Sequence, residues 1–151
     1  MSARRLENGG LIDRRKELRF TFNGKPMTGY DGDTVASALM ANGVGIVARS
    51  FKYHRPRGFF GAGREDPSAM LAVRDKHGFD AAVRAADIHL TEGMDVRTSI
   101  GFPSAAFDIG ALIGPFARFI KAGFYYKTFK WPDWRWFEPV IKHTTGFGRI
   151  D

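Results

Sequence analysis

The chain has 151 residues, of which 44% are hydrophobic and 26% are charged, and its formal net charge is +7. This length suffices for one domain with a buried core and a modest appendage, but not for a multi-step enzyme. Because the sequence contains no cysteine, it excludes a disulfide framework, a thiolate metal site and a cysteine nucleophile.

The sequence indicates neither export nor membrane insertion. The segment MSARRLENGGLIDRRKELRF is charged throughout and lacks the apolar core of a signal peptide. The most apolar stretch, AAFDIGALIGPFARFI, is interrupted by Asp108, Gly110, Gly114, Pro115 and Arg118, so it falls short of the roughly 18 to 20 apolar residues of a spanning helix. We therefore expect a soluble, cytoplasmic protein with no membrane partner, whose residues 1–17 form a polar N-terminal arm.

A β-hairpin and a helix are expected after this arm. LRFTF alternates apolar and polar side chains, and the Asn-Gly pair that follows supplies the positive φ angles of a type I′ turn before KPMTGY. In DGDTVASALMANGVG, Asp33 or Thr34 is a candidate helix cap. Val35, Ala38 and Leu39 then form an apolar stripe at helical spacing, and the second Asn-Gly pair is typical of a helix end.

A long loop and several strands follow the helix. A short strand is expected at IVARS, and the glycine, proline and charge of FKYHRPRGFFGAGREDPS predict an extended loop. Further strands are expected at AMLAVRD, VRAADIHL and MDVRTSI, with a turn at TEGM. Together these elements predict an α+β fold, in which residues 18–100 form a β-grasp domain with a mixed sheet cradling one helix.

Residues 101–151 have a different composition from the rest. They contain all 3 tryptophans and most of the bulky aromatic residues, broken by glycine and proline into short pieces. They predict an aromatic C-terminal arm, extended with short helices. An aromatic surface of this density either packs on its own domain or docks onto another polypeptide, and we expect docking. The candidate docking residues are Phe124, Tyr125, Tyr126, Phe129, Trp131, Trp134, Trp136 and Phe137.

The basic segment RSFKYHRPRG carries the candidate anion contacts. Arg49, Lys52, Arg55 and Arg57 lie on a loop stiffened by proline. Guanidinium groups bind phosphates and carboxylates bidentately, so these residues are candidates to contact the phosphate of a cofactor or a carboxylate substrate across a subunit interface. The alternative role is packing and salt bridges between domains.

No catalytic or metal-binding residue is predicted. The histidines His54, His77, His89 and His143 have no spacing that would place two on one helix face for a metal ion. The segment GAGRED has Asp66 where the third glycine of a dinucleotide fingerprint would fall, so we do not expect a nucleotide site there.

Three segments are long and irregular enough to be specific: DGDTVASALMANGV, RSFKYHRPRG and AGFYYKTFKWP. They resemble the N-terminal part of the alpha subunit of heterotetrameric sarcosine oxidases and related N-methyl amino acid oxidoreductases, and the resemblance extends from about Leu6 over nearly the whole chain. It implies a ferredoxin-like β-grasp domain, a fold that in some relatives holds a [2Fe-2S] cluster in a C-x4-C-x2-C loop. The segment RGFFGAGREDPSAMLAV occupies that place without a cysteine, so the resemblance implies the fold without the cluster.

The resemblance also implies a function. The chain would be a non-catalytic structural subunit, or a fragment of the alpha subunit, of a flavoenzyme complex that oxidatively demethylates an N-methyl amino acid. Its cofactors would be FAD, FMN and NAD, held by flavin-binding and dinucleotide-binding subunits, and this chain alone would have no turnover. A Rossmann domain follows the aromatic segment in such alpha subunits, so this chain is either one piece of a split subunit or a fragment. The alternative function is a basic β-grasp module that binds single-stranded nucleic acid.

Overall fold

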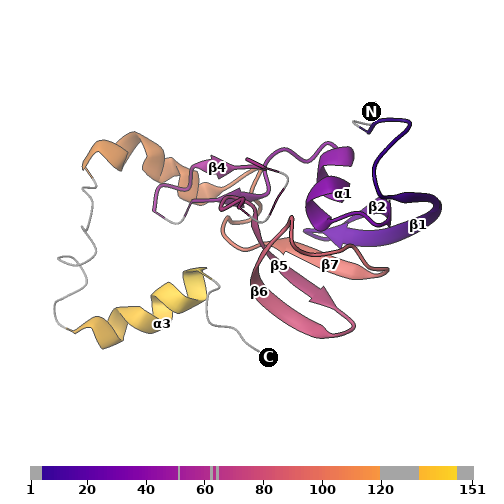
Figure 1. Ribbon diagram of the computed structural model, residues 1–151. Coiled ribbons are helices and arrows are strands. Elements are labelled where there is room, and N and C mark those ends of the chain that lie inside the picture. The colour runs from indigo at the N-terminus through magenta and orange to yellow at the C-terminus, as the bar shows by residue number, and fades with distance from the viewer. Residues whose placement is uncertain (1–4, 51, 62, 64, 120–132, 146–151) are drawn as a thin grey trace.

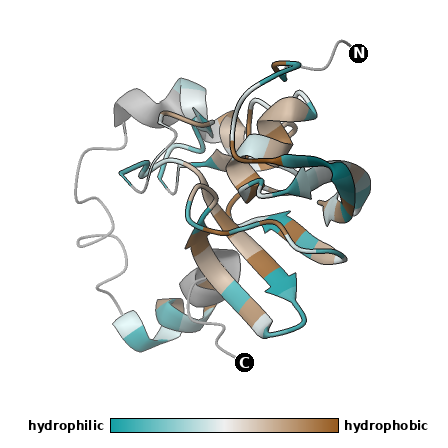
Figure 2. Ribbon diagram, turned by 45° about the vertical axis from the view of Figure 1, so that its right-hand side comes forward, coloured by the Kyte–Doolittle hydropathy of each residue, from teal (hydrophilic) through white to brown (hydrophobic). Residues whose placement is uncertain are grey.

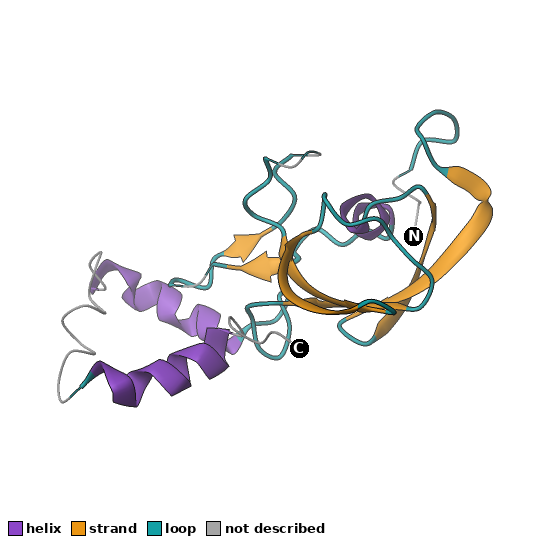
Figure 3. Ribbon diagram, turned by 60° about the horizontal axis from the view of Figure 1, so that its bottom comes forward, coloured by secondary structure: helices purple, strands orange, loops and turns teal. Residues whose placement is uncertain are grey.

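The computed structural model describes residues 5–50, 52–61, 63, 65–119 and 133–145. At its centre lies a five-stranded sheet in the order β2-β1-β7-β5-β6, made of β1 (Asp13–Phe22), β2 (Lys25–Asp31), β5 (Met70–Asp75), β6 (Gly78–Arg84) and β7 (Met94–Thr98). Helix α1 (Val35–Ala41) lies against one face, and the sheet curves around it (Figures 1 and 3). A separate two-stranded sheet of β3 (Ala48–Arg49) and β4 (Pro56–Arg57) lies beside the main sheet.

The predicted hairpin is confirmed. β1 and β2 pair antiparallel and are joined by Asn23 and Gly24, whose φ angles of 50° and 77° are those that a type I′ turn requires. β1 begins at Asp13, so the strand includes residues that the sequence assigns to the N-terminal arm. β1 also pairs parallel with β7, whereas β5 pairs antiparallel with both β6 and β7. The sheet is therefore mixed, as expected.

Helix α1 forms the second layer of the domain. Thr34 is its N-cap and forms a capping box with Ser37, while Val35, Ala38 and Leu39 are fully buried against the sheet. The core is completed by apolar residues of the strands: Leu18, Phe20, Phe22, Leu71, Val73, Met94 and Val96. Each such large side chain stabilises the fold by about 1.5–3 kcal/mol relative to leaving it in water. Hydrophobic and hydrophilic residues alternate in bands along the strands (Figure 2), so one face of the sheet supplies the core.

The prediction of a strand at VRAADIHL is wrong for most of that segment. β6 covers Gly78–Arg84, and the chain then turns back toward the start of α1. There the N–H groups of Val35 and Ala36 donate to the carbonyls of Ile88 and Ala85. The first N–H groups of a helix have no partner inside the helix, so this segment satisfies the helix start instead of extending the sheet.

The C-terminal region contains two helices among its described residues. They are the 3-10 helix η1 (Ile109–Phe119) and α3 (Trp134–Thr145), which agree with the short helices expected there. Each contains a proline, Pro115 in η1 and Pro139 in α3. Within the described ranges, no helix is both long enough and apolar enough to cross a membrane.

Candidate functional site

The basic residues predicted from the sequence lie on the β3–β4 hairpin. Ser50 N–H donates to the carbonyl of Arg55, and His54 N–H donates to the carbonyl of Ser50. The Ser50 hydroxyl in turn accepts from Arg55 N–H at 2.9 Å. The tip of the hairpin is therefore fixed by its own hydrogen bonds.

Arg49 stabilises the structure around the hairpin. Its guanidinium donates to the carbonyl oxygens of Ala105, His54 and Ala106 at 2.6, 3.0 and 3.2 Å. Its side chain is only 10% exposed. The structure thus places the donors of Arg49 against carbonyl groups of its own chain.

Lys52, Arg55 and Arg57 lie together beside an open hollow. The hollow has a volume of about 500 Å³ and is lined by Ser50, Lys52, Tyr53, Arg55, Pro56 and Arg57. Lys52 Nζ and Arg55 Cζ each lie 4.9 Å from the centre of the Tyr53 ring, within the range of a cation–π contact. Since three of the lining residues are cationic and none is acidic, the hollow suits an anionic group.

Asp108 joins this hairpin to the segment that follows the sheet. Its buried carboxylate accepts from His54 Nδ1–H at 2.6 Å and from the N–H groups of Phe102 and Gly110 at 3.0 and 3.1 Å. Burial raises the pKa of Asp108, but the N–H of Phe102, the ring of His54 and the N–H of Gly110 together outweigh it and hold the pKa below its ordinary value.

Sequence reasoning missed Asp108 as an organising residue. The signal was present, because a carboxylate inside an otherwise apolar stretch is either exposed or held by several donors. The neighbouring Gly110 is required by the same contact, since a Cβ there would lie 2.3 Å from the His54 ring.

The glycine-rich loop that corresponds to a cluster loop closes on the carboxylate of Asp66. This buried side chain accepts from the N–H groups of Phe60, Gly61 and Ser68 at 2.9, 3.3 and 2.7 Å. Burial raises the pKa of Asp66, but hydrogen bonds from the backbone N–H groups, that of Ser68 first, lower it below the ordinary value. Among the described residues, no group of three or more His, Cys, Asp or Glu side chains could hold a metal ion.

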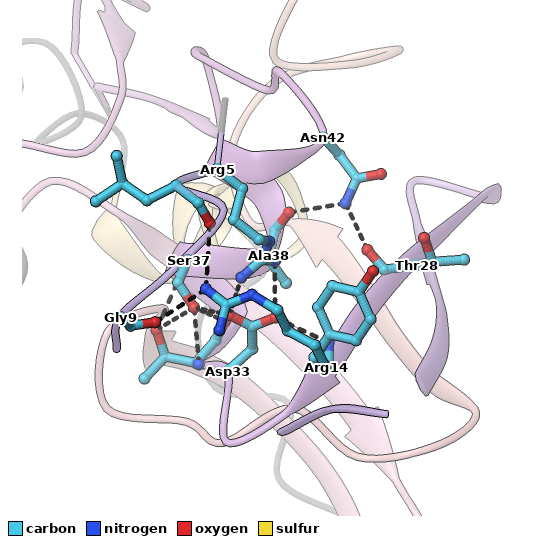
Figure 4. A network of polar contacts seen from close by, with 11 residues as sticks. Arg5, Gly9, Arg14, Thr28, Asp33, Ser37, Ala38 and Asn42 are labelled. Atoms are coloured by element: carbon cyan, nitrogen blue, oxygen red, sulfur yellow. Dashed lines mark hydrogen bonds and ion pairs between the residues drawn. The ribbon is translucent and has the colours of Figure 1, made fainter. Parts of the chain in front are cut away.

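A third buried aspartate, Asp33, holds the N-terminal segment. Arg5 donates to both of its carboxylate oxygens, at 2.9 and 2.8 Å, while Ser37 Oγ–H and Tyr30 N–H donate at 2.7 and 2.9 Å. Figure 4 shows these side chains converging at the start of α1. Burial raises the pKa of Asp33, but hydrogen bonds from Arg5, Ser37 and Tyr30 outweigh it and lower the pKa below the ordinary value.

Two further contacts keep the N-terminal segment in place. Arg14 donates to the carbonyl oxygens of Leu6 and Gly9 at 3.1 and 2.9 Å (Figure 4). Gly32 has a φ of +91°, and a Cβ there would lie 2.4 Å from the carbonyl oxygen of Leu11. Residues 5–12 therefore pack against the domain through specific contacts.

The predicted docking residues are described only in part. Trp134 and Trp136, on α3, are exposed and Phe137 is partly exposed. Phe124, Tyr125, Tyr126, Phe129 and Trp131 lie outside the described residues. The structure adds a second group of exposed apolar side chains, between Phe102 and Leu112, that are not among the predicted docking residues.

Residues 15–101 match the family described as "2Fe-2S iron-sulfur cluster binding domain", which is more than half of the chain. The chain is 50% identical over 152 residues to "Sarcosine oxidase subunit alpha" of Rhizobium meliloti (strain 1021), covering 99% of this chain and 15% of that protein. It is 37% identical over 96 residues to the protein of the same name from Corynebacterium sp. (strain U-96), covering 62% of this chain and 10% of that protein. The chain thus spans 15% or less of these relatives.

Among solved structures, the chain is similar to the crystal structure of L-proline dehydrogenase from P. horikoshii. The identity is 24%, the TM-score is 0.47, and the match covers 61% of this chain and 17% of that one. A likeness of this size carries no argument about function.

Proposed function

The chain belongs to the family of 2Fe-2S iron-sulfur cluster binding domains, and we propose that it is a non-catalytic structural component of a sarcosine oxidase-like flavoenzyme complex. The observation that carries this proposal is its 50% identity, over 99% of its length, to a sarcosine oxidase alpha subunit. A cluster held by thiolates does not fit this chain, because its 151 residues include no cysteine and the corresponding loop is closed on Asp66.

The reaction of the complex would be the oxidative demethylation of an N-methyl amino acid in the cytoplasm. A flavin held by other polypeptides of the complex would supply the hydride acceptor for the N-methyl carbon of the substrate, with oxygen or another compound as the final electron acceptor. FAD, FMN and NAD would be held mainly by flavin-binding and dinucleotide-binding polypeptides of the complex. The chain's own contribution would be to position those polypeptides, so no turnover is expected from it alone.

We assign the sheet order β2-β1-β7-β5-β6, with α1 against one face, to the β-grasp class. Two surfaces would connect this domain to the flavoprotein. The first is the aromatic C-terminal arm, of which Trp134 and Trp136 are exposed. Large aromatic side chains of this kind supply much of the energy of protein–protein contacts.

The second surface is the hollow beside Tyr53. Lys52, Arg55 and Arg57 would contact a phosphate or carboxylate that lies across the interface. Arg49 would have a different role, because its guanidinium already donates to three carbonyl groups within this chain. It would hold the hairpin in place while the other three side chains make the contact.

The nucleic-acid alternative is the weaker of the two. The same cationic and aromatic residues would suit a single strand. However, the 50% identity over 99% of the chain favours the flavoenzyme complex. The two functions also differ in their dependence on salt, because the affinity for an oligonucleotide falls steeply as ionic strength rises.

The proposal is tested by purifying the chain, with an affinity tag, from its own host at moderate salt. Native mass spectrometry and an absorbance spectrum are then recorded on the same sample. We expect larger partner polypeptides and the absorbance of an oxidised flavin. A colourless chain that elutes alone, or with nucleic acid, would overturn the proposal.

A further inference from the structure

The segment from Phe102 to Leu112 exposes large apolar side chains on a fixed backbone. Phe102, Phe107, Ile109 and Leu112 are between 53% and 73% exposed. The backbone beneath them is closed by hydrogen bonds, from Ile109 N–H to the Phe102 carbonyl at 2.8 Å and from Ser104 N–H to the Phe107 carbonyl at 3.1 Å. Apolar side chains gathered on an ordered surface are typical of an interaction site.

This segment is attached to the β3–β4 hairpin through Asp108. The carboxylate of Asp108 binds His54 of the hairpin and, at the same time, the N–H groups of Phe102 and Gly110. Arg49 adds hydrogen bonds from the hairpin to the carbonyls of Ala105 and Ala106. Because Arg49 and His54 of the hairpin both donate to acceptors of this segment, the hairpin and the apolar segment are held in one arrangement.

The hairpin that contacts the apolar segment also carries positive charge. Arg55 and Arg57 are both exposed, and within the part of the chain that the structure describes, no carboxylate forms an ion pair with either. An apolar surface joined to a cationic hairpin is complementary to an apolar surface that also carries carboxylates.

We infer that Arg55 and Arg57 of the β3–β4 hairpin form, with the segment 102–112, one composite docking surface for the flavin-bearing polypeptide of the proposed complex. Asp108 acts as the positioning residue that holds its two halves together. This inference rests on the proposed function. The occupant is a flavin-bearing polypeptide because the matched region is only 15% of the length of the Rhizobium meliloti relative, so most of that polypeptide lies outside it. The chain's net charge of +7 favours an acidic partner surface.

The test uses the full chain, tagged and expressed in its own host, with the amount of co-purified flavin per tagged chain as the readout. In one variant, Phe107→Ser is combined with Leu112→Ser. The matched control is Leu11→Ser, because Leu11 is 99% exposed in the N-terminal segment. We expect the double variant to retain roughly tenfold less flavin than the wild type. The control should retain as much flavin as the wild type.

The contribution of the cationic side chains and the positioning role of Asp108 are tested with the same readout, the co-purified flavin. The double variant Arg55→Glu with Arg57→Glu should reduce the amount of co-purified flavin and change how that amount depends on salt concentration. The control is Lys25→Glu, which replaces an exposed cation of β2 and should change neither quantity. Asp108→Ala should reduce the flavin more than Asp108→Asn, which keeps one acceptor oxygen. The melting temperature of each free chain is measured as the control for folding.

The outcomes separate this inference from the proposed function. If the wild-type chain brings down no flavin, the proposed function fails and the inference fails with it. If the wild-type chain brings down flavin and the Phe107/Leu112 variant brings down as much, the proposed function stands but the docking surface is wrong. A loss of flavin from the Leu11 control equal to that from the double variant would also overturn the docking surface.

Discussion

Asp108 accepts a hydrogen bond of 2.6 Å from Nδ1–H of His54, although 54 residues of sequence separate them. Because an ionised carboxylate only accepts hydrogen bonds, the contact fixes the His54 proton on Nδ1. It connects the hairpin of β3 and β4 to the segment that follows β7, and thereby joins the two parts of the candidate docking surface.

Replacement of Asp108 should destabilise the domain. Asp108→Ala removes the acceptor for the N–H groups of Phe102 and Gly110 and for the His54 ring. We expect the free energy of unfolding to fall by about 2–3 kcal/mol, and by less for Asp108→Asn. Urea denaturation followed by circular dichroism measures the change. If the free energy of unfolding falls no more than it does for a substitution at an exposed surface position, Asp108 does not have this role.

Asp66 should hold the glycine-rich loop in place. In Asp66→Ala, the N–H groups of Phe60, Gly61 and Ser68 lose their acceptor, so their hydrogen exchange should become faster and the domain should lose about 2 kcal/mol. The control is Glu65→Ala, which removes an exposed carboxylate next to it in the sequence. Equal exchange rates in both variants would show that the loop is held by other contacts.

The pair of Arg5 and Asp33 should hold the N-terminal segment. Arg5→Ala removes two charge-assisted hydrogen bonds to a buried carboxylate, so residues 5–12 should exchange their amide hydrogens faster, and stability should fall by about 1–2 kcal/mol. Arg15→Ala is the control, because its ion pair with Asp13 is exposed to solvent. If the two substitutions have the same effect, the Arg5 contact does not hold the segment.

From the lowered pKa values of the three buried aspartates we expect acid to destabilise the fold. The pKa values of Asp33, Asp66 and Asp108 are all below the ordinary value, so the unfolded chain binds protons at a higher pH than the folded chain does. Their contribution is therefore complete above the unfolded pKa of about 3.9 and is lost as the pH falls through the lower folded values. The melting temperature should fall steeply below about pH 4, and a melting temperature unchanged down to pH 3 would contradict this.

Local patterns predicted much of the fold correctly. The Asn23-Gly24 pair predicted the hairpin because both residues need positive φ angles, and the stripe of Val35, Ala38 and Leu39 predicted α1 and its buried face. The error between residues 85 and 90 has a tertiary origin. That segment has the composition of a strand, but its carbonyls bind the start of α1, which no local pattern reveals.

The candidate site was predictable only in part. The sequence located the basic segment but predicted an extended loop after β3, where β4 pairs with β3 to form a hairpin. It also did not distinguish Arg49, which is held by carbonyl groups, from Arg55 and Arg57, which line the hollow. The roles of Asp66 and Asp108 depend on burial and on N–H groups from other parts of the chain. The neighbours of Asp66 in sequence, which include glycine, proline and serine, indicate only a turn, and those of Asp108 are mainly apolar and do not reveal its donors.

The central claim is that this chain is a component, without chemistry of its own, of a complex that oxidises N-methyl amino acids. The most direct measurement is an anaerobic titration, with sarcosine and other N-methyl amino acids, of the complex purified through this chain and of the chain alone. We predict that substrate bleaches the flavin absorbance of the complex, while the chain alone shows no visible absorbance and no turnover. A flavin in the complex that none of these amines reduces, or turnover by the chain alone, would contradict the claim.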